Sequence, residues 1–94
     1  MSLTTSEIRK LLKKWHFYKA ITLNSPEEEL GRKVRAIENA LNYLEDIDQE
    51  IIRLKYFLLV DIDVIQSKVG ISRSGVYYRL DKALQELLYI IKNI

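Results

Sequence analysis

The fold is decided by residues 62–84, which read IDVIQSKVGISRSGVYYRLDKAL. A short helical segment ends at Val69, Gly70 follows it, and Ser72 precedes a second helical segment. Glycine tolerates the positive φ that a tight corner between two helices requires. Serine favours the start of a helix because its hydroxyl accepts a hydrogen bond from a free backbone N–H. The stretch therefore predicts two helices that meet at a steep angle, with Gly70 and Ile71 in the turn.

The apolar and polar side chains around this turn are arranged as a helix-turn-helix requires, with one group facing inward and the other outward. The side chains expected to point inward and fix the angle are Ile65, Val69, Ile71 and Val76. The side chains expected to point outward from the start of the second helix are Arg73, Ser74, Tyr77 and Tyr78. In DNA-binding proteins this end of the second helix reaches base edges in the major groove. Arginine can pair with guanine there, serine can donate or accept, and tyrosine can pack on a thymine methyl or bond a phosphate. An ordinary helical hairpin that only packs a core is the alternative on this pattern alone.

The remaining segments also carry helix signals. Thr4 and Glu7 have capping-box spacing, and the apolar stripe that follows continues to Tyr18. Ser25-Pro26 starts a second helix, Asp46 with Gln49 starts a third by the same capping rule, and Asp61 or Asp63 caps the short helix that ends at Val69. Gly31 lies inside the second pattern, so a close helix crossing is expected there.

We therefore expect an all-α fold of about five helices in one domain, residues 1–94. It would comprise a basic N-terminal helix (1–24), a helix with an acidic start (25–45), and a helix-turn-helix unit with a long C-terminal helix (46–94). The last helix is apolar on more than one face. These apolar residues are Leu84, Leu87, Leu88, Tyr89, Ile90, Ile91 and Ile94. Either the N-terminal helix covers them or a second chain does, which would make a homodimer.

The amino-acid composition favours some classes of protein and excludes others. The chain has 94 residues, three Gly, one Pro and no Cys, which favours one helical core over a β-sandwich and excludes a disulfide framework. The net charge of +2 is polarised, with +4 in residues 1–24, −5 in residues 25–50 and +3 in residues 51–94. No apolar run approaches the roughly 20 residues that span a bilayer. We expect a soluble cytoplasmic protein without a membrane partner, and we put no weight on Met1, Ser2 and Leu3.

Catalytic signals are weak throughout the sequence. It contains no Gly-rich phosphate loop, no Ser/His/Asp set and no pair of histidines, since His16 is the single histidine. The acidic run Glu27–Glu29 is an ordinary helix start. We expect no enzyme activity, no metal, no cofactor and no small-molecule substrate. Tyr56-Phe57 fits the core better than an aromatic platform for single strands.

A longer pattern points to a family. Residues 46–57 (DIDQEIIRLKYF), thirteen further residues, residues 71–80 (ISRSGVYYRL) and residues 82–84 (KAL) together resemble region 4 of the sigma-70 family factors. Within that superfamily the pattern is most similar to small phage-encoded regulators of the ArpU and RinA type. The resemblance covers roughly residues 36–88. It implies a positioning helix over 62–69 and a recognition helix over 72–88.

The resemblance also implies roles for individual residues. Arg73, Ser74, Tyr77 and Tyr78 would read bases. The candidates for contact with the DNA backbone lie on or beside the motif and are Lys55, Lys68, Ser72, Arg79 and Lys82, and a side chain that is only solvated is the alternative for each lysine. Arg79 stands where the family usually has an apolar residue, so either the local face is rotated or its stem packs while its head reaches solvent or phosphate. Asp81 stands where a basic or neutral residue is common, and a carboxylate there would repel phosphate or accept from cytosine.

The sequence thus predicts a transcriptional regulator of phage or prophage origin that binds double-stranded DNA. One alternative is a protein–protein module that binds RNA polymerase or an anti-sigma-like partner, because the segment 25–50 is acidic. Another is the small subunit of a phage DNA-packaging complex, which would share the motif and assemble into rings.

Overall fold

The computed structural model describes residues 3–93, and every regular element in that range is helical. In chain order these are α1 (Thr5–Lys13), α2 (Trp15–Thr22), α3 (Glu29–Leu41), α4 (Asp46–Ile52), the π-helical turn η1 (Arg53–Phe57), α5 (Ile62–Val69) and α6 (Arg73–Asn93). The predicted all-α class is confirmed, with six α-helices in the described range instead of about five. Ile94, which belongs to the apolar C-terminal group of the sequence, lies outside the described residues.

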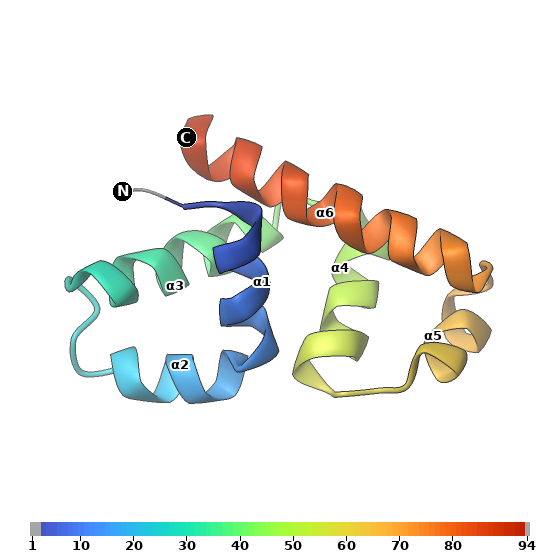
Figure 1. Cartoon of the computed structure of the whole chain (residues 1–94). Helices are drawn as coiled ribbons and strands as arrows, with labels where there is room; N and C mark the ends of the chain where they lie inside the picture. The colour runs from blue at the N-terminus through green and yellow to red at the C-terminus, as the bar shows by residue number, and fades with distance from the viewer. Residues whose placement is uncertain (1–2, 94) are drawn as a thin grey trace.

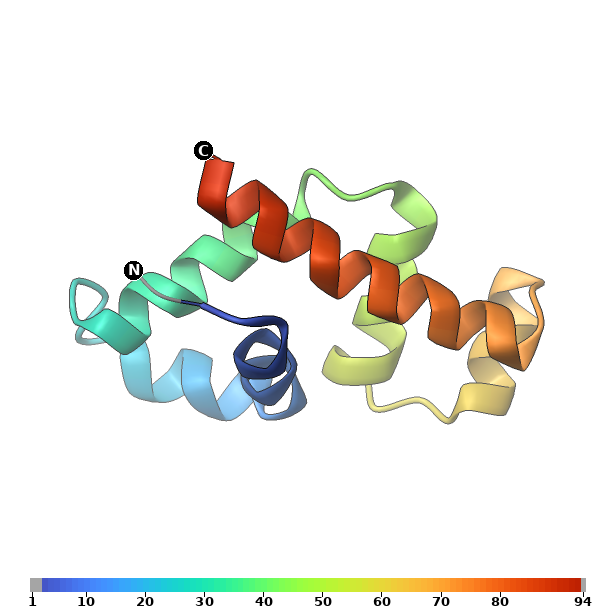
Figure 2. The same ribbon diagram turned by 45° about the horizontal axis from the view of Figure 1, so that its top comes forward.

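The long helix α6 is the spine of the molecule. It packs against α1, α3, α4 and α5. Figure 1 shows α1, α2 and α3 gathered toward its C-terminal half, and α4 and α5 toward its N-terminal half. The tilted view in Figure 2 shows the same division, with α6 crossing the whole length of the fold. The molecule measures 39 × 26 × 20 Å.

The core is one cluster of apolar side chains that runs beneath α6. The contribution of α6 consists of Val76, Leu80, Ala83, Leu84 and Leu87. Toward its C-terminus Leu88, Ile90 and Ile91 are half-buried against this core, and Tyr89 is exposed. Because α1 and α3 lie against α6, the chain itself covers much of the apolar surface for which the sequence left a second chain as an alternative.

The N-terminal segment forms two helices, so the expectation of one basic helix within residues 1–24 is wrong. The Thr4 hydroxyl accepts a hydrogen bond from the Glu7 N–H at 3.2 Å, as the capping-box spacing predicts. However, the backbone of Lys14 leaves the helical region (φ −123°, ψ 40°), and α2 starts in a new direction at Trp15. The break lets Trp15 stack on Phe57 with ring centroids 5.6 Å apart, while α2 continues against α3.

The second predicted helix starts later than its sequence signals indicate. Ser25 and Pro26 form a turn in which the Ser25 carbonyl accepts from the Glu28 N–H at 3.2 Å, and α3 begins at Glu29. This turn folds back on Gly31, where an added Cβ would lie 2.5 Å from the Ser25 carbonyl oxygen and 2.8 Å from Pro26 Cα. The close approach expected at Gly31 therefore exists, but its partner is a turn and not another helix.

The segment between α4 and α5 starts with a π-helical turn, which is wider than an α-helical turn. In η1 the Leu58 N–H donates to the Arg53 carbonyl at 2.9 Å, which is the i→i−5 pattern of a π-helix. Tyr56 is buried and Phe57 half-buried, so the core assignment of this pair is confirmed. Leu59 then adopts a positive φ of 54°, and the chain enters α5 with Asp61 at the N-cap position.

Candidate nucleic-acid interface

The turn between α5 and α6 contains the positive φ that the sequence predicts at Gly70. Gly70 is left-handed (φ 72°, ψ 31°), and its N–H donates to the Gln66 carbonyl at 2.8 Å. No atom lies within 4 Å of a Cβ added at this position, so the glycine is required by backbone conformation and not by space. Ile65 and Val76 are fully buried on either side of the turn, while Val69 and Ile71 are half-buried. The hydrophobic core therefore holds α5 and α6 together on both sides of the turn.

Ser72 closes the N-terminus of α6. Its Oγ accepts from the Gly75 N–H at 3.1 Å, and its carbonyl accepts the first helical hydrogen bond from Val76 at 2.9 Å. The Ser74 hydroxyl lies 3.2 Å from the Ser72 hydroxyl. The Ser72 hydroxyl, a predicted contact of the DNA backbone, is thus already a helix cap, and the residue remains exposed.

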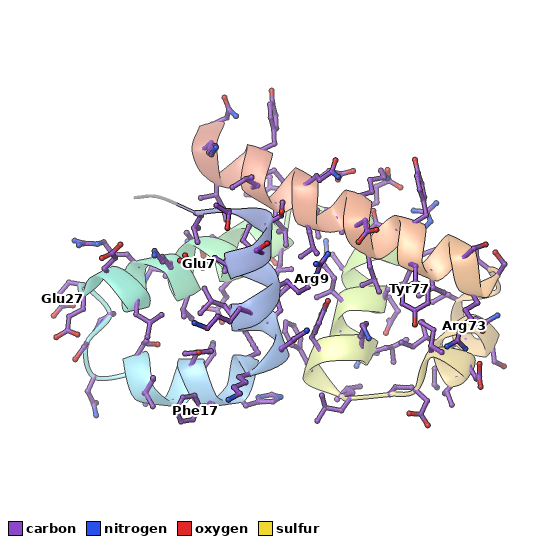
Figure 3. All side chains as sticks on the ribbon, viewed as in Figure 1. Glu7, Arg9, Phe17, Glu27, Arg73 and Tyr77 are labelled. Atoms are coloured by element: carbon purple, nitrogen blue, oxygen red, sulfur yellow. The ribbon has the colours of Figure 1, made fainter. Side chains whose placement is uncertain are left out.

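All four side chains expected to read bases are exposed on the first two turns of α6. The side chain of Arg73 is 58% exposed, Tyr77 is 44% exposed and Tyr78 is 68% exposed. Ser74 is also exposed. Figure 3 shows Arg73 and Tyr77 below the N-terminal end of α6, on the side where α4 and α5 lie. The structure therefore brings this set together on a surface that the rest of the chain leaves open.

Two contacts at this surface escape a reading of the sequence. Arg73 Nη1 lies 3.2 Å from Asp63 Oδ1, and its guanidinium lies over the Tyr77 ring at 5.9 Å from the centroid. Asp63 is 82% exposed, so this pair is weak and can exchange for another acceptor. Arg73 and Asp63 are ten residues apart and lie on either side of the turn, so helical spacing does not predict their contact.

The lysines assigned to the backbone fall into two groups. Lys68 is exposed in the last turn of α5, next to the α6 N-terminus, and forms no ion pair within residues 3–93. Lys55 is half-buried, with its ammonium 5.7 Å from the centroid of the Tyr56 ring. Lys68 is therefore well placed beside the turn, whereas Lys55 lies back on η1.

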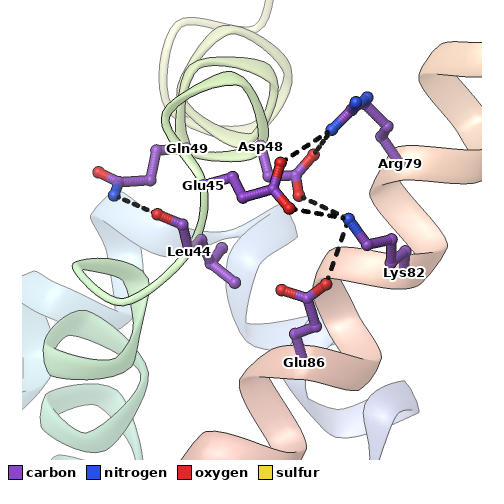
Figure 4. A network of polar contacts seen from close by, with 7 residues as sticks. All are labelled: Leu44, Glu45, Asp48, Gln49, Arg79, Lys82 and Glu86. Carbon is purple, nitrogen blue, oxygen red and sulfur yellow. Dashed lines mark hydrogen bonds and ion pairs between the residues drawn. The ribbon is translucent and has the colours of Figure 1, made fainter.

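Arg79 and Lys82 lie in an ion-pair network between α4 and α6 (Figure 4). Arg79 Nη1 is 3.1 Å from Asp48 Oδ1, and Lys82 Nζ is 3.5 Å from Asp48 Oδ2. Glu45 contacts both cations, and Glu86 contacts Lys82 at 3.3 Å. The hydrogen bond from Arg79 to Asp48 raises the pKa of the guanidinium, and the Lys82–Glu86 contact raises the pKa of the ammonium. Because both cations have partners inside the molecule, we leave them out of the interface proposed below.

Asp48 is the centre of this network, and the sequence reading missed it. Its side chain is fully buried, and its Oδ2 has no hydrogen-bond partner although Lys82 is near. The sequence spacing could have indicated that Asp48 is buried. It precedes the apolar Ile51 and Ile52 by three and four residues, so it shares their face of the helix. The capping pair expected between Asp46 and Gln49 is not formed. Instead the Gln49 amide donates to the Leu44 carbonyl at 2.8 Å (Figure 4).

The other features weighed in the sequence have structural roles or no cluster around them. His16 Nε2 donates to the Phe57 carbonyl at 2.9 Å and so satisfies the end of η1. Residues 3–93 contain no group of three or more metal-ligating side chains. In the same range no helix combines the length and the apolar character needed to cross a membrane.

Comparison of the chain with models of known protein families, with curated proteins and with solved structures gives no match in any of the three. The candidate interface therefore stands on its own residues and geometry.

Proposed function

We propose that this protein binds double-stranded DNA and regulates transcription, with the N-terminal end of α6 in the major groove. The observation that carries the proposal is the exposed end of α6 beyond the left-handed Gly70. The proposal would have no basis if one helix continued through Gly70, or if Arg73 were buried against the core. Neither occurs, since the turn is tight and the Arg73 side chain is 58% exposed.

In this proposal Arg73, Ser74, Tyr77 and Tyr78 face base edges, and Lys68 binds a phosphate beside the turn. Arg73 exchanges Asp63 for a base, because an exposed ion pair costs little to break. Tyr77 supports the Arg73 guanidinium from below through its ring face. We further propose a regulator of the sigma region 4 type, of phage or prophage origin, that acts in the cytoplasm of a bacterial cell. The homodimer and the packaging ring stay predictions, which the mass of the protein in solution tests.

The test starts from a selection of duplex fragments from a random pool by the intact protein. Arg73→Ala should then weaken binding to the selected duplex by about 5- to 150-fold, which corresponds to the 1–3 kcal/mol of one bidentate base contact. Arg35→Ala, an exposed arginine on α3, is the matched control and should bind as the wild type does. Far-UV circular dichroism should remain helical for both variants. If no duplex is enriched, or if Arg73→Ala binds the selected duplex unchanged, the proposal is wrong.

One observation favours a second candidate function, the binding of a partner protein such as RNA polymerase or an anti-sigma-like protein. Leu58 is 54% exposed and Leu59 is 73% exposed, and they lie next to each other on the loop before α5. Exposed apolar surface of this kind can mark a site of contact with another protein when it forms part of a larger patch. This function predicts that binding of the chain to its target changes little between low and physiological salt, whereas duplex binding falls steeply.

A further inference from the structure

A second charged surface lies on α1, apart from the end of α6. Side chains of α1 and the start of α2 surround an open hollow of about 280 Å³. Its lining consists of Ser6, Arg9, Lys10, Lys13, Lys14 and Tyr18. We call these six residues the α1 hollow. Four of them are cations and two carry hydroxyl groups, which is a set suited to phosphate oxygens.

The α1 hollow has few internal counter-charges. Among the described residues Lys10, Lys13 and Lys14 take part in no ion pair, and all three are exposed. Arg9 pairs with Asp81 at 3.3 Å, and both side chains are largely open to solvent (44% and 67% exposed). The nearby Glu7 is occupied by Lys33 at 2.5 Å. Asp81 is thus the one acidic side chain among the described residues that forms an ion pair with a cation of the hollow, and three of the hollow's four cations remain unpaired.

A direct structural connection leads from the hollow to the exposed end of α6. Arg73, Tyr77 and Asp81 follow one another at four-residue intervals and so lie on one face of α6. Asp81 then contacts Arg9 on α1. Figure 3 shows Arg9, Tyr77 and Arg73 following each other along α6. Eight residues of helix separate Arg73 from Asp81, which is about 12 Å along the axis.

We propose that the α1 hollow binds phosphates of the same DNA duplex, on the strand that borders the groove occupied by α6. The inference rests on the proposed function. The major groove is about 12 Å wide, so an α6 that crosses the groove with Arg73 at one side would place Asp81 near the other side. When the first turns of α6 lie in the groove, Asp81 and Arg9 lie near its edge, and the three lysines extend along the bordering backbone. The N-terminal helix is then a second DNA contact, and Asp81 holds Arg9 in place instead of facing the phosphates alone.

The test compares two variants that lose the same charge in different places. The hollow variant is Lys10→Gln/Lys13→Gln/Lys14→Gln. The control variant is Arg32→Gln/Arg35→Gln/Lys92→Gln, which removes three exposed cations outside the hollow. Glutamine is a good helix former, so both variants should fold as the wild type does. The duplex selected by the wild type is the probe, and binding is measured as a function of salt together with hydroxyl-radical protection of its sugars.

The hollow variant should reduce the magnitude of the slope of log K against log salt by about 2–3, since each lost phosphate contact accounts for about 0.9. The hollow variant should also lose hydroxyl-radical protection at the groove edge while keeping protection where α6 lies. The control variant should change neither the salt slope nor the footprint. If the hollow variant has the slope and footprint of the control while Arg73→Ala still weakens binding, this inference is wrong and the proposed function stands. If the wild type enriches no duplex, both are wrong.

Discussion

Asp48 and Arg79 face each other between α4 and α6, with Oδ1 and Nη1 3.1 Å apart and the Asp48 side chain fully buried. A buried carboxylate loses its hydration and needs charged or polar partners in exchange. Arg79 and Lys82 supply these partners from the second and third turns of α6, just beyond its exposed end. The pair therefore fixes the distance between α4 and the part of α6 that presents Arg73 and Tyr77.

We predict that Asp48→Asn lowers the free energy of unfolding by about 1.5–3 kcal/mol, the range for a hydrogen bond to a charged group. The amide keeps the shape of the side chain but removes the negative charge between two cations. Asp46→Asn on the same helix is exposed and should cost below about 1 kcal/mol, the scale of a charge near a helix N-terminus. Urea unfolding measures both, and equal losses would mean that the buried pair does not stabilise the α4–α6 packing.

Gly70 provides a prediction about backbone conformation alone. Its φ is 72°, and nothing lies within 4 Å of an added Cβ. Gly70→Ala should therefore lower the free energy of unfolding by about 1–2 kcal/mol, the cost of a left-handed conformation for an L-residue. Gly70→Asn should cost less, because asparagine tolerates this region. Thermal unfolding of the two variants tests the order, and an alanine variant as stable as the wild type would contradict the left-handed turn.

Gly31 makes the complementary prediction, because its limit is space. Alanine inside a helix is normally about 1 kcal/mol better than glycine. Here the new Cβ would meet backbone atoms of Ser25 and Pro26 at 2.5–2.8 Å, and backbone cannot rotate away as a side chain can. We expect Gly31→Ala to lower the free energy of unfolding by about 1–3 kcal/mol, as overpacking does. Asn39→Ala, exposed on the same helix, should be neutral or slightly stabilising, and a gain of stability in both variants would show that the turn moves freely.

Local rules account for the parts of the fold that were predicted well. The Thr4 cap, the left-handed Gly70 and the Ser72 cap each depend on residues within four positions of one another. The exposure of Arg73 and Tyr77 follows from the same local geometry. These features can be predicted because one turn of helix contains all the groups that decide them.

The parts that were missed depend on contacts between distant segments. The break at Lys14 places Trp15 on Phe57, which lies 42 residues later in the chain. Asp48 and Arg79 are 31 residues apart, so helical spacing cannot show that they pair. Leu3, to which we gave no weight, is buried at 5% exposure in the core. In each case packing between helices, and not local propensity, decides the outcome.

Tyr56 gives the protein a specific response to alkaline pH. Burial raises its pKa above the ordinary value of 10, although Arg9 nearby lowers it in part. The unfolded chain ionises Tyr56 at a lower pH than the folded chain does. Its contribution to stability is therefore complete below pH 10 and is lost as the pH rises through the higher pKa of the folded state. The raised pKa values of Lys33 and Lys82 act in the same direction.

We predict that Tyr56 ionises in a step above pH 10 in an absorbance titration at 295 nm, together with the alkaline loss of helix. This late step should be absent in Tyr56→Phe. It should persist in Tyr89→Phe, because that variant removes a tyrosine that is 69% exposed and leaves Tyr56 buried. A titration curve that Tyr56→Phe and Tyr89→Phe change in the same way would show that Tyr56 is accessible to water.

Ser72 has two roles that two substitutions can separate, since its Oγ caps α6 and its position faces the proposed DNA. Ser72→Ala removes the cap and should lower the free energy of unfolding by about 1 kcal/mol. Ser72→Asp keeps a cap and places a negative charge at the positive end of the helix, so its stability should equal or exceed that of the wild type. The same carboxylate would face phosphates, so Ser72→Asp should bind the selected duplex more weakly than Ser72→Ala, although it is the more stable protein. Chemical unfolding measures the stability of the two variants, and duplex titration measures their binding. The more stable variant binds more weakly only if the N-terminus of α6 lies against DNA. If Ser72→Asp binds as tightly as the wild type, α6 does not belong to the interface.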